Sequence, residues 1–124
     1  MERVLVVDDM KSMRAVIRAV LEDMGLAEVD EAEDGRAALI LLAKAHYGLV
    51  ISDWNMPGVD GITLLRAIRG HEALKMTPVI MMTTEASRDH ILETRSLGVS
   101  GFVRKPFSPQ DLEAAVRRVI PAAA

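Results

Sequence analysis

The chain has 124 residues, half of them hydrophobic, with a net charge of −3 and no cysteine. This length fits one domain with a sizeable core, and the charge argues against nucleic acid as the main partner. The absence of cysteine excludes disulfides, thiolate metal sites and cysteine nucleophiles. No apolar run approaches the roughly 20 residues of a membrane span, and the N-terminus has no signal-peptide pattern. We therefore expect a cytoplasmic protein with no membrane contact.

The first third of the chain predicts a strand, a helix and a second strand. Arg3–Val7 is a short apolar run typical of a buried parallel strand. The segment after it has helical spacing and ends at Gly25; its apolar positions are Met13, Val16, Ile17, Val20, Leu21 and Met24. Glu28–Glu31 is a second strand, and its low apolar content predicts a place at the edge of the sheet.

The middle of the chain predicts a helix over Arg36–Ala45, a strand over Leu49–Ser52 and a third helix, marked by Ile62, Leu65 and Ile68. In the Arg36–Ala45 helix, the expected buried face consists of Ala38, Leu39 and Leu42. Ile40 and Leu41 would then point partly outward. Isolated apolar residues are normal on surfaces, and the sharper alternative is a small contact patch for a partner or a second copy.

The last third predicts two more strands, Pro78–Met82 and Gly101–Arg104, separated by a helix that ends at Gly98 and is marked by Ile91, Leu92, Arg95 and Leu97. The final helix begins with a cap at Ser108 and Pro109 at its first position. Asp111 lies in its first turn, and its buried face is Leu112, Val116, Val119 and Ile120. The tail over 122–124 is expected to fray.

Five strands that alternate with five helices predict an α/β fold, a single doubly wound five-stranded parallel sheet with helices on both faces. The strand order 2-1-3-4-5, as in flavodoxin-like folds, is one common solution for such a sheet. We see no linker or repeat, so one domain over residues 1–124 is expected.

Polar residues stand at the carboxyl ends of four predicted strands. Asp8 and Asp9 follow the first, Asp53 the third, Thr83 the fourth and Lys105 the fifth. Ligands of open α/β sheets bind in the crevice outside these ends. Carboxylates that converge there raise each other's pKa, so a divalent cation and a lysine are the expected partners.

This set of groups fits phosphoryl transfer. Mg²⁺ prefers oxygen ligands, and a backbone carbonyl near Asn55 can join the carboxylates. Asp53, on the central strand, is the best nucleophile, and Lys105 and Thr83 can hold phosphoryl oxygens. The structural alternatives are that Asp9 only caps the first helix and that Lys105 is solvated. Four matching strand ends in one chain favour the shared site.

The same residues carry a family resemblance. The stretches VLVVDD and ISDWNMPGVDG, the threonine after the fourth strand and the lysine of VRKPF resemble, in this order, the receiver domain of two-component response regulators. The resemblance covers essentially the whole chain. The stretches AEDG, VISDWNMP and TTEAS are most similar to the single-domain chemotaxis regulators of that family.

The resemblance implies that Asp53 accepts a phosphoryl group from a histidine kinase. It implies Mg²⁺ bound by Asp8, Asp9, Asp53 and the Asn55 carbonyl, with Thr83 and Lys105 on the phosphoryl oxygens. The protein would then be a signalling protein that catalyses only its own phosphorylation and dephosphorylation.

The resemblance also implies a switch and a partner face, built from the fourth helix, the fifth strand and the fifth helix. Its residues are Thr84, Glu85, Arg88, Ile91 and Phe102. Two positions depart from the pattern, because tyrosine is common where Phe102 stands and a small residue where Thr84 stands. Phenylalanine fills space but makes no hydroxyl hydrogen bond. Asn55 and Glu85 are the positions where a phosphatase would act.

The implied output partner is the flagellar motor switch protein, and a monomer is expected. A phosphate sink, or a regulator of another two-component pathway, is the alternative within the family. The rivals from other classes are a haloacid dehalogenase-type aspartyl-phosphate hydrolase and a flavodoxin. The first needs Asp-x-Asp, whereas this chain has adjacent Asp8 and Asp9, and the second needs a phosphate loop that these carboxylates would repel.

Overall fold

The computed structural model describes residues 2–84 and 88–120. Its strands are β1 (Val4–Val7), β2 (Val29–Ala32), β3 (Leu49–Asp53), β4 (Val79–Thr83) and β5 (Gly101–Arg104). Its helices are α1 (Lys11–Asp23), α2 (Gly35–Lys44), α3 (Gly61–Gly70), α4 (Arg88–Ser96) and α5 (Pro109–Val119). Strand and helix alternate along the chain as the apolar pattern predicts. The expected tail over 122–124 lies outside the described residues.

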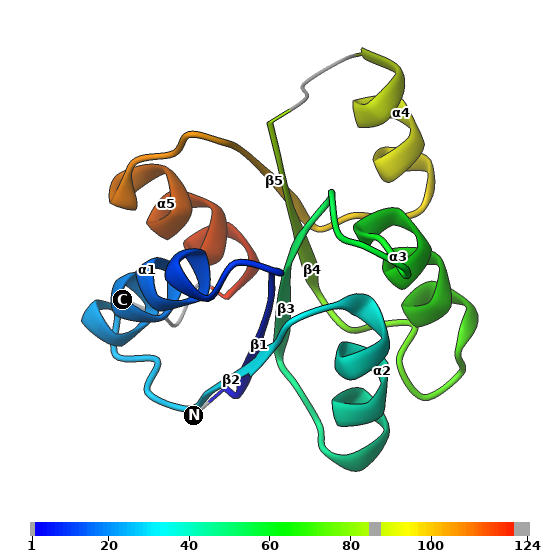
Figure 1. The fold of residues 1–124 in the computed structure, drawn as a ribbon, viewed down its shortest axis with the longest axis horizontal. Coiled ribbons are helices and arrows are strands. Elements are labelled where there is room, and N and C mark those ends of the chain that lie inside the picture. The colour runs from blue at the N-terminus through cyan, green and yellow to red at the C-terminus, as the bar shows by residue number, and fades with distance from the viewer. Residues whose placement is uncertain (1, 85–87, 121–124) are drawn as a thin grey trace.

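The strands form one parallel sheet in the order β2-β1-β3-β4-β5, which confirms the predicted fold. Helices α1 and α5 cover one face, and α2 and α3 cover the other, with α4 beside α3 (Figure 1). Right-handed crossovers between parallel strands produce this two-faced arrangement. None of the described helices is long and apolar enough to cross a membrane.

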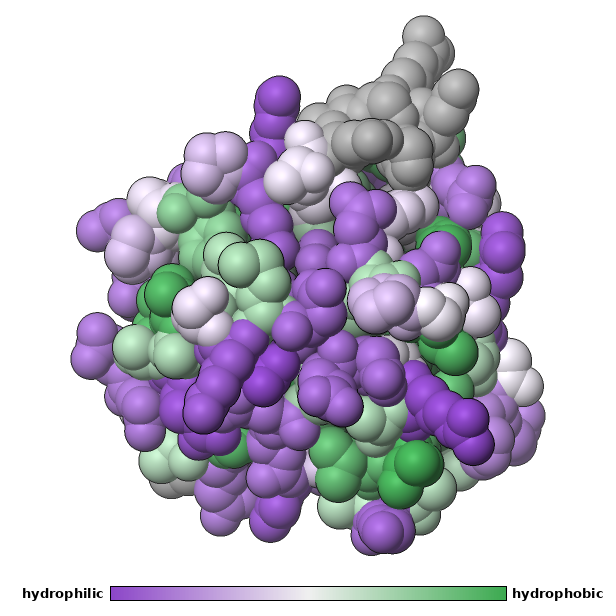
Figure 2. All heavy atoms as spheres, in the orientation of Figure 1, coloured by the Kyte–Doolittle hydropathy of each residue, from purple (hydrophilic) through white to green (hydrophobic). Residues whose placement is uncertain are grey.

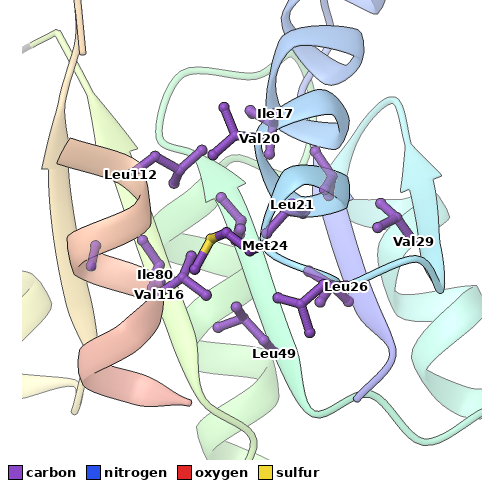
Figure 3. Close-up of a cluster of buried hydrophobic side chains, with 14 of the residues drawn as sticks. Ile17, Val20, Leu21, Met24, Leu26, Val29, Leu49, Ile80, Leu112 and Val116 are labelled. Carbon is purple, nitrogen blue, oxygen red and sulfur yellow. The ribbon is translucent and has the colours of Figure 1, made fainter. Parts of the chain in front are cut away.

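Each face of the sheet has its own hydrophobic core, because β1, β3 and β4 are buried along their whole length. Figure 3 shows the first core, where α1 and α5 meet the sheet; it includes Ile17, Val20, Leu21, Met24, Leu49, Ile80, Leu112 and Val116. The second core lies under α2 and α3 and includes Leu5, Val50, Leu64, Leu65 and Ile68. Packing on both faces therefore holds the three central strands in place, and with them the residues at their carboxyl ends.

The edge strand β2 has the sparse burial that its sequence predicts. The first and last residues of the strand, Val29 and Ala32, are buried, while Asp30 and Glu31 between them are partly exposed. The strand is shifted by one residue toward the C-terminus from the predicted Glu28–Glu31. Strand β4 is shifted in the same way from the predicted Pro78–Met82, and β3 is one residue longer than predicted, so that Asp53 and Thr83 are the last residues of their strands.

One prediction about helix faces needs correction. Val16 was expected in the buried face of α1 but is largely exposed, because it lies at the border of the stripe that Ile17 and Leu21 define. On α2, Ile40 is exposed and Leu41 is only partly buried, as expected for two residues that point partly outward. On the face drawn in Figure 2, most surface residues are hydrophilic and the hydrophobic ones form small separate groups.

Candidate functional site

The end of β1 places Asp8 inside the crevice and Asp9 at its rim. Asp8 is 0% exposed, and its backbone N–H donates to the Ala32 carbonyl oxygen of β2 at 3.1 Å. Its carboxylate accepts the Met10 backbone N–H at 2.9 Å on one oxygen and Lys105 Nζ at 3.1 Å on the other. Asp9 is exposed. It does not cap α1, because the N-cap residue is Met10 and no side chain caps that end.

Asp53 ends the central strand β3 and is 7% exposed. Lys105 Nζ lies 3.2 Å from Asp53 Oδ1, so the lysine contacts Asp8 and Asp53 together. Carboxylate oxygens of Asp8, Asp9 and Asp53 all lie within 4.8 Å of one another. The parallel sheet therefore brings together three acids and one lysine from three separate strand ends.

The electrostatics of Asp53 follow from this crowding. Burial raises the pKa of Asp53 above the usual aspartate value, the positive charge of Lys105 opposes that shift, and the Asp8 carboxylate adds to it. The Asn55 backbone N–H donates to the Asp53 carboxylate and also favours its ionised form. Further positive charge in the crevice would therefore strengthen ionisation of Asp53.

The backbone at Asp53 is held by the start of α3. The Gly61 N–H donates to the Trp54 carbonyl oxygen at 2.9 Å, and Asp60 caps the helix by accepting the Thr63 N–H. A Cβ atom at Gly61 would lie 2.9 Å from Trp54 Cα and would collide with the Asp53 carbonyl oxygen. Only glycine allows this close approach of the helix to the end of β3.

Thr83 and Lys105 close the other side of the crevice. Thr83 is buried at the end of β4, and its carbonyl oxygen accepts the Lys105 backbone N–H at 2.7 Å. Thr84 is exposed. The Lys105–Pro106 peptide bond is cis. Trp54, the residue after Asp53, is 7% exposed and packs into the second core.

The predicted partner face contains a hollow. A cavity of about 380 Å³ is lined by Ile91 and Arg95 of α4, by residues 99–102 and by Arg118 of α5. Phe102 is half-buried and packs against the second core. Arg88 is the first residue of α4, and its side chain is not described. Glu85 lies outside the described residues.

Two residues near the crevice, Arg14 and Glu31, were missed by sequence reasoning. Arg14 of α1 donates from Nη1 to the Asp8 carbonyl oxygen at 2.7 Å and from Nε to Glu31 of β2 at 2.9 Å. The available signal was a basic residue in the first turn of the helix that follows the strand-end aspartates. The sequence pattern does not reveal which carbonyl such a long side chain reaches.

The donor set has the chemistry of a magnesium site. Its ligands are all carboxylate oxygens, which a hard divalent cation prefers, and neither sulfur nor imidazole is among them. Lys105 contacts two of the three carboxylates and supplies one of the charges that such a cluster needs. The residues present therefore fit Mg²⁺.

Comparisons with known proteins agree with this geometry. The response regulator receiver domain family matches residues 4–117. The chain is 44% identical over 117 residues to the chemotaxis protein CheY of Pseudomonas aeruginosa, covering 94% of each chain. It is 44% identical over 111 residues to the chemotaxis protein CheY-3 of Vibrio cholerae, covering 90% of this chain and 85% of that protein.

Solved structures give the same result. The chemotaxis protein CheY4 of Vibrio cholerae aligns with a TM-score of 0.89 and 40% identity, covering 96% of this chain and 98% of that one. The receiver domain of the Francisella response regulator 1452 aligns with a TM-score of 0.86 and 30% identity, covering 98% and 99%. The receiver resemblance is thereby confirmed over the haloacid dehalogenase and flavodoxin rivals.

Proposed function

The chain belongs to the response regulator receiver domain family, and from this premise we propose that it is a chemotaxis response regulator phosphorylated on Asp53. One observation carries the proposal: a buried carboxylate at the end of the central strand faces both Lys105 and a second buried carboxylate, Asp8. The chemotaxis role is supported by the 44% identity to CheY of Pseudomonas aeruginosa. Like that family, the chain is a signalling protein and not a classical enzyme.

Asp8, Asp9 and Asp53, with the Asn55 backbone carbonyl, would hold Mg²⁺ in the crevice. When bound, Mg²⁺ offsets negative charge on the carboxylates and on the phosphoryl oxygens. The charge of Lys105 acts in the same direction, and the buried position of Asp53 keeps bulk water away from the reacting oxygen.

The reaction is a transfer from a phosphohistidine to Asp53. A carboxylate oxygen of Asp53 attacks phosphorus, the P–N bond breaks, and the imidazole nitrogen leaves with the electron pair. The departing nitrogen takes up a proton from solvent, so the products are an acyl phosphate on Asp53 and a neutral histidine on the kinase. Lys105 and Thr83 hold two of the phosphoryl oxygens, and this contact draws Thr83 toward the crevice.

The signal then passes to the α4-β5-α5 face. In the structure described above, Phe102 is half-buried and packs against the second core. Movement of Thr83 leaves space into which Phe102 can turn. The hollow between α4 and α5 changes shape, and Thr84, Glu85, Arg88 and Ile91 complete the face. Arg95 and Arg118 line the hollow, so an acidic segment of the flagellar motor switch protein is a suitable occupant.

Labelling of Asp53 tests the proposal. Asp53→Asn should carry no label after incubation with radiolabelled acetyl phosphate or a phosphorylated histidine kinase, because an amide cannot form the acyl phosphate. Asp34→Asn is a matched control, since Asp34 caps α2 and asparagine caps equally well. It should label as the wild type does. Full labelling of the Asp53→Asn variant would exclude Asp53 as the acceptor.

The output is a separate question, because a phosphate sink would show the same chemistry at Asp53. A pulldown with the motor switch protein and the kinase, using phosphorylated and unphosphorylated protein, separates these roles. We expect phosphorylation to increase retention by the motor switch protein. Retention by the kinase alone would instead favour a sink or another two-component pathway.

A further inference from the structure

Arg14 connects the crevice to the edge of the sheet. It lies in the first turn of α1, and its side chain is only 14% exposed. One nitrogen, Nη1, donates to the Asp8 carbonyl oxygen at 2.7 Å, and another, Nε, donates to Glu31 Oε1 at 2.9 Å. The guanidinium thus bridges the loop after β1 and the edge strand β2.

The carbonyl that Arg14 holds belongs to the peptide group joining Asp8 and Asp9. This group is planar, so fixing its oxygen also fixes the Asp9 nitrogen and restricts the direction in which the Asp9 side chain leaves the backbone. Asp9 needs such a constraint. The Asp8 carboxylate is held on both oxygens, but no hydrogen bond or ion pair among residues 2–84 and 88–120 holds the Asp9 carboxylate.

Glu31 in turn holds Arg14. Its second carboxylate oxygen accepts Arg18 Nε at 2.9 Å and lies 2.8 Å from Arg18 Nη2. Arg18 also donates to the Val29 carbonyl oxygen, which belongs to the same edge strand. The two arginines therefore share a helix and an acidic partner, and they differ in one respect. Arg14 contacts the Asp8–Asp9 peptide, whereas the hydrogen bonds and ion pair of Arg18 within residues 2–84 and 88–120 all go to β2.

We propose that Arg14 is a positioning residue for the cation site, orienting the Asp9 carboxylate toward Asp8 and Asp53 through the peptide it holds. The inference rests on the Mg²⁺ site of the proposed function. Ligand-orienting partners outside the ligand shell typically matter for metal affinity.

The positive charge of Arg14 makes the inference easy to test. The charge alone and the positioning role predict opposite changes in Mg²⁺ affinity when Arg14 is removed. A guanidinium near the carboxylates repels a cation, so deleting it would tighten Mg²⁺ binding if only its charge mattered. Deleting it weakens binding if its hold on the Asp8–Asp9 peptide dominates. The direction of the change in Mg²⁺ affinity therefore separates the two roles.

The experiment compares Arg14→Met with Arg18→Met, both as the full chain. Mg²⁺ affinity is measured by fluorescence of Trp54, the only tryptophan, and by electron paramagnetic resonance of Mn²⁺ as a direct probe. We expect Arg14→Met to raise the Mg²⁺ Kd roughly tenfold, in the range for partners that orient a ligand. Arg18→Met should leave the Kd close to that of the wild type, although urea unfolding should show both variants destabilised.

A double-mutant cycle with Asp9→Asn separates the positioning role from general destabilisation, because destabilisation alone would not make the effect of Arg14→Met on the Kd depend on Asp9. The effect of Arg14→Met on the Kd should largely disappear when Asp9 is already replaced, since the two residues act through one carboxylate. If Arg14→Met does not fold, Arg14→Lys serves in its place, because lysine lacks the planar fork by which the guanidinium reaches the carbonyl oxygen and Glu31 from two separate nitrogens.

Three results would overturn the inference: unchanged or tighter Mg²⁺ binding by the Arg14 variant, an equal loss in Arg18→Met, or a full effect in the Asp9→Asn background. These results leave the proposed Mg²⁺ site intact, provided that the wild-type protein binds the ion. Wild-type protein that binds neither Mg²⁺ nor Mn²⁺ would overturn both the site and the role of Arg14.

Discussion

Single residues in this protein take their properties from neighbours that are distant in sequence, and Tyr47 is a clear case away from the crevice. Tyr47 is 2% exposed, and its hydroxyl donates to Asp30 of β2 at 2.6 Å. Arg3 donates to the same carboxylate at 3.3 Å. Burial and the hydrogen bond to Asp30 raise the pKa of Tyr47 from 10.0 to about 12. One hydroxyl thus ties the edge strand to the start of β3.

This pKa predicts how stability depends on pH. Between pH 10 and pH 12 the unfolded chain releases the Tyr47 proton and the folded chain keeps it, so the free energy of unfolding falls as pH rises. The contribution is complete below pH 10 and amounts to roughly 2 kcal/mol over that window. Tyr47→Phe should lack this fall, although lysine titration remains in both proteins. Urea unfolding at pH 10 and at pH 12 measures this fall in the free energy of unfolding. An equal fall in the wild-type protein and in Tyr47→Phe would contradict the assignment.

The crevice could be predicted residue by residue because its members stand at strand ends. Asp8, Asp53, Thr83 and Lys105 follow or end apolar runs, and a parallel sheet brings such ends together whatever the side-chain details. Arg14 could not be found in this way, because its role depends on how α1 docks against β2. The same dependence explains why Val16 was wrongly predicted as buried.

Among the helices, α5 has an N-terminus that is well explained by the residues next to it in the sequence. Ser108 Oγ accepts the Asp111 N–H, Asp111 Oδ2 accepts the Ser108 N–H, and Pro109 occupies the first turn. These are the local signals that predicted the helix. Arg69 of α3 is the opposite case. It donates to the carbonyl oxygens of Thr77 at 2.6 Å and Gly98 at 2.8 Å, joining loops that no local pattern connects.

Removing the cap of α5 should lower stability without touching the chemistry. Ser108→Ala loses the side-chain acceptor, which should reduce the free energy of unfolding by about 1 kcal/mol in urea. Ser108→Thr keeps an acceptor and should lose less. Labelling of Asp53 by acetyl phosphate should proceed in Ser108→Ala as in the wild type. A large loss of labelling would mean that α5 influences the crevice more directly than its contacts indicate.

On the scale of the whole molecule, the sheet separates two tasks. The carboxyl ends of its strands carry the acidic crevice, and the helices bury both faces in two distinct cores. Right-handed crossovers leave few possible strand orders, and the observed order is the common one that we named from the sequence. The shape of the hollow beside Phe102 was not, since it depends on how α4 and α5 meet β5.

Because the cation ligands come from two strands, ion binding should stabilise the whole fold. At a Mg²⁺ concentration about 100 times the Kd, the free energy of unfolding should rise by about 2.7 kcal/mol. Asp9→Asn should reduce this gain at the same concentration, because it removes a ligand. Thermal unfolding with and without Mg²⁺ measures the effect. If Mg²⁺ does not change the melting temperature of the wild-type protein, the proposed site is contradicted.

The lysine between Asp8 and Asp53 has one more consequence. When ionised, three carboxylates and one ammonium leave the crevice with two net negative charges. The phosphoryl group of the proposed reaction is also an anion, so these two charges alone would repel it. A divalent ion cancels that repulsion. Under the proposed function, the protein would therefore accept a phosphoryl group from its donor only when a divalent ion is bound as well.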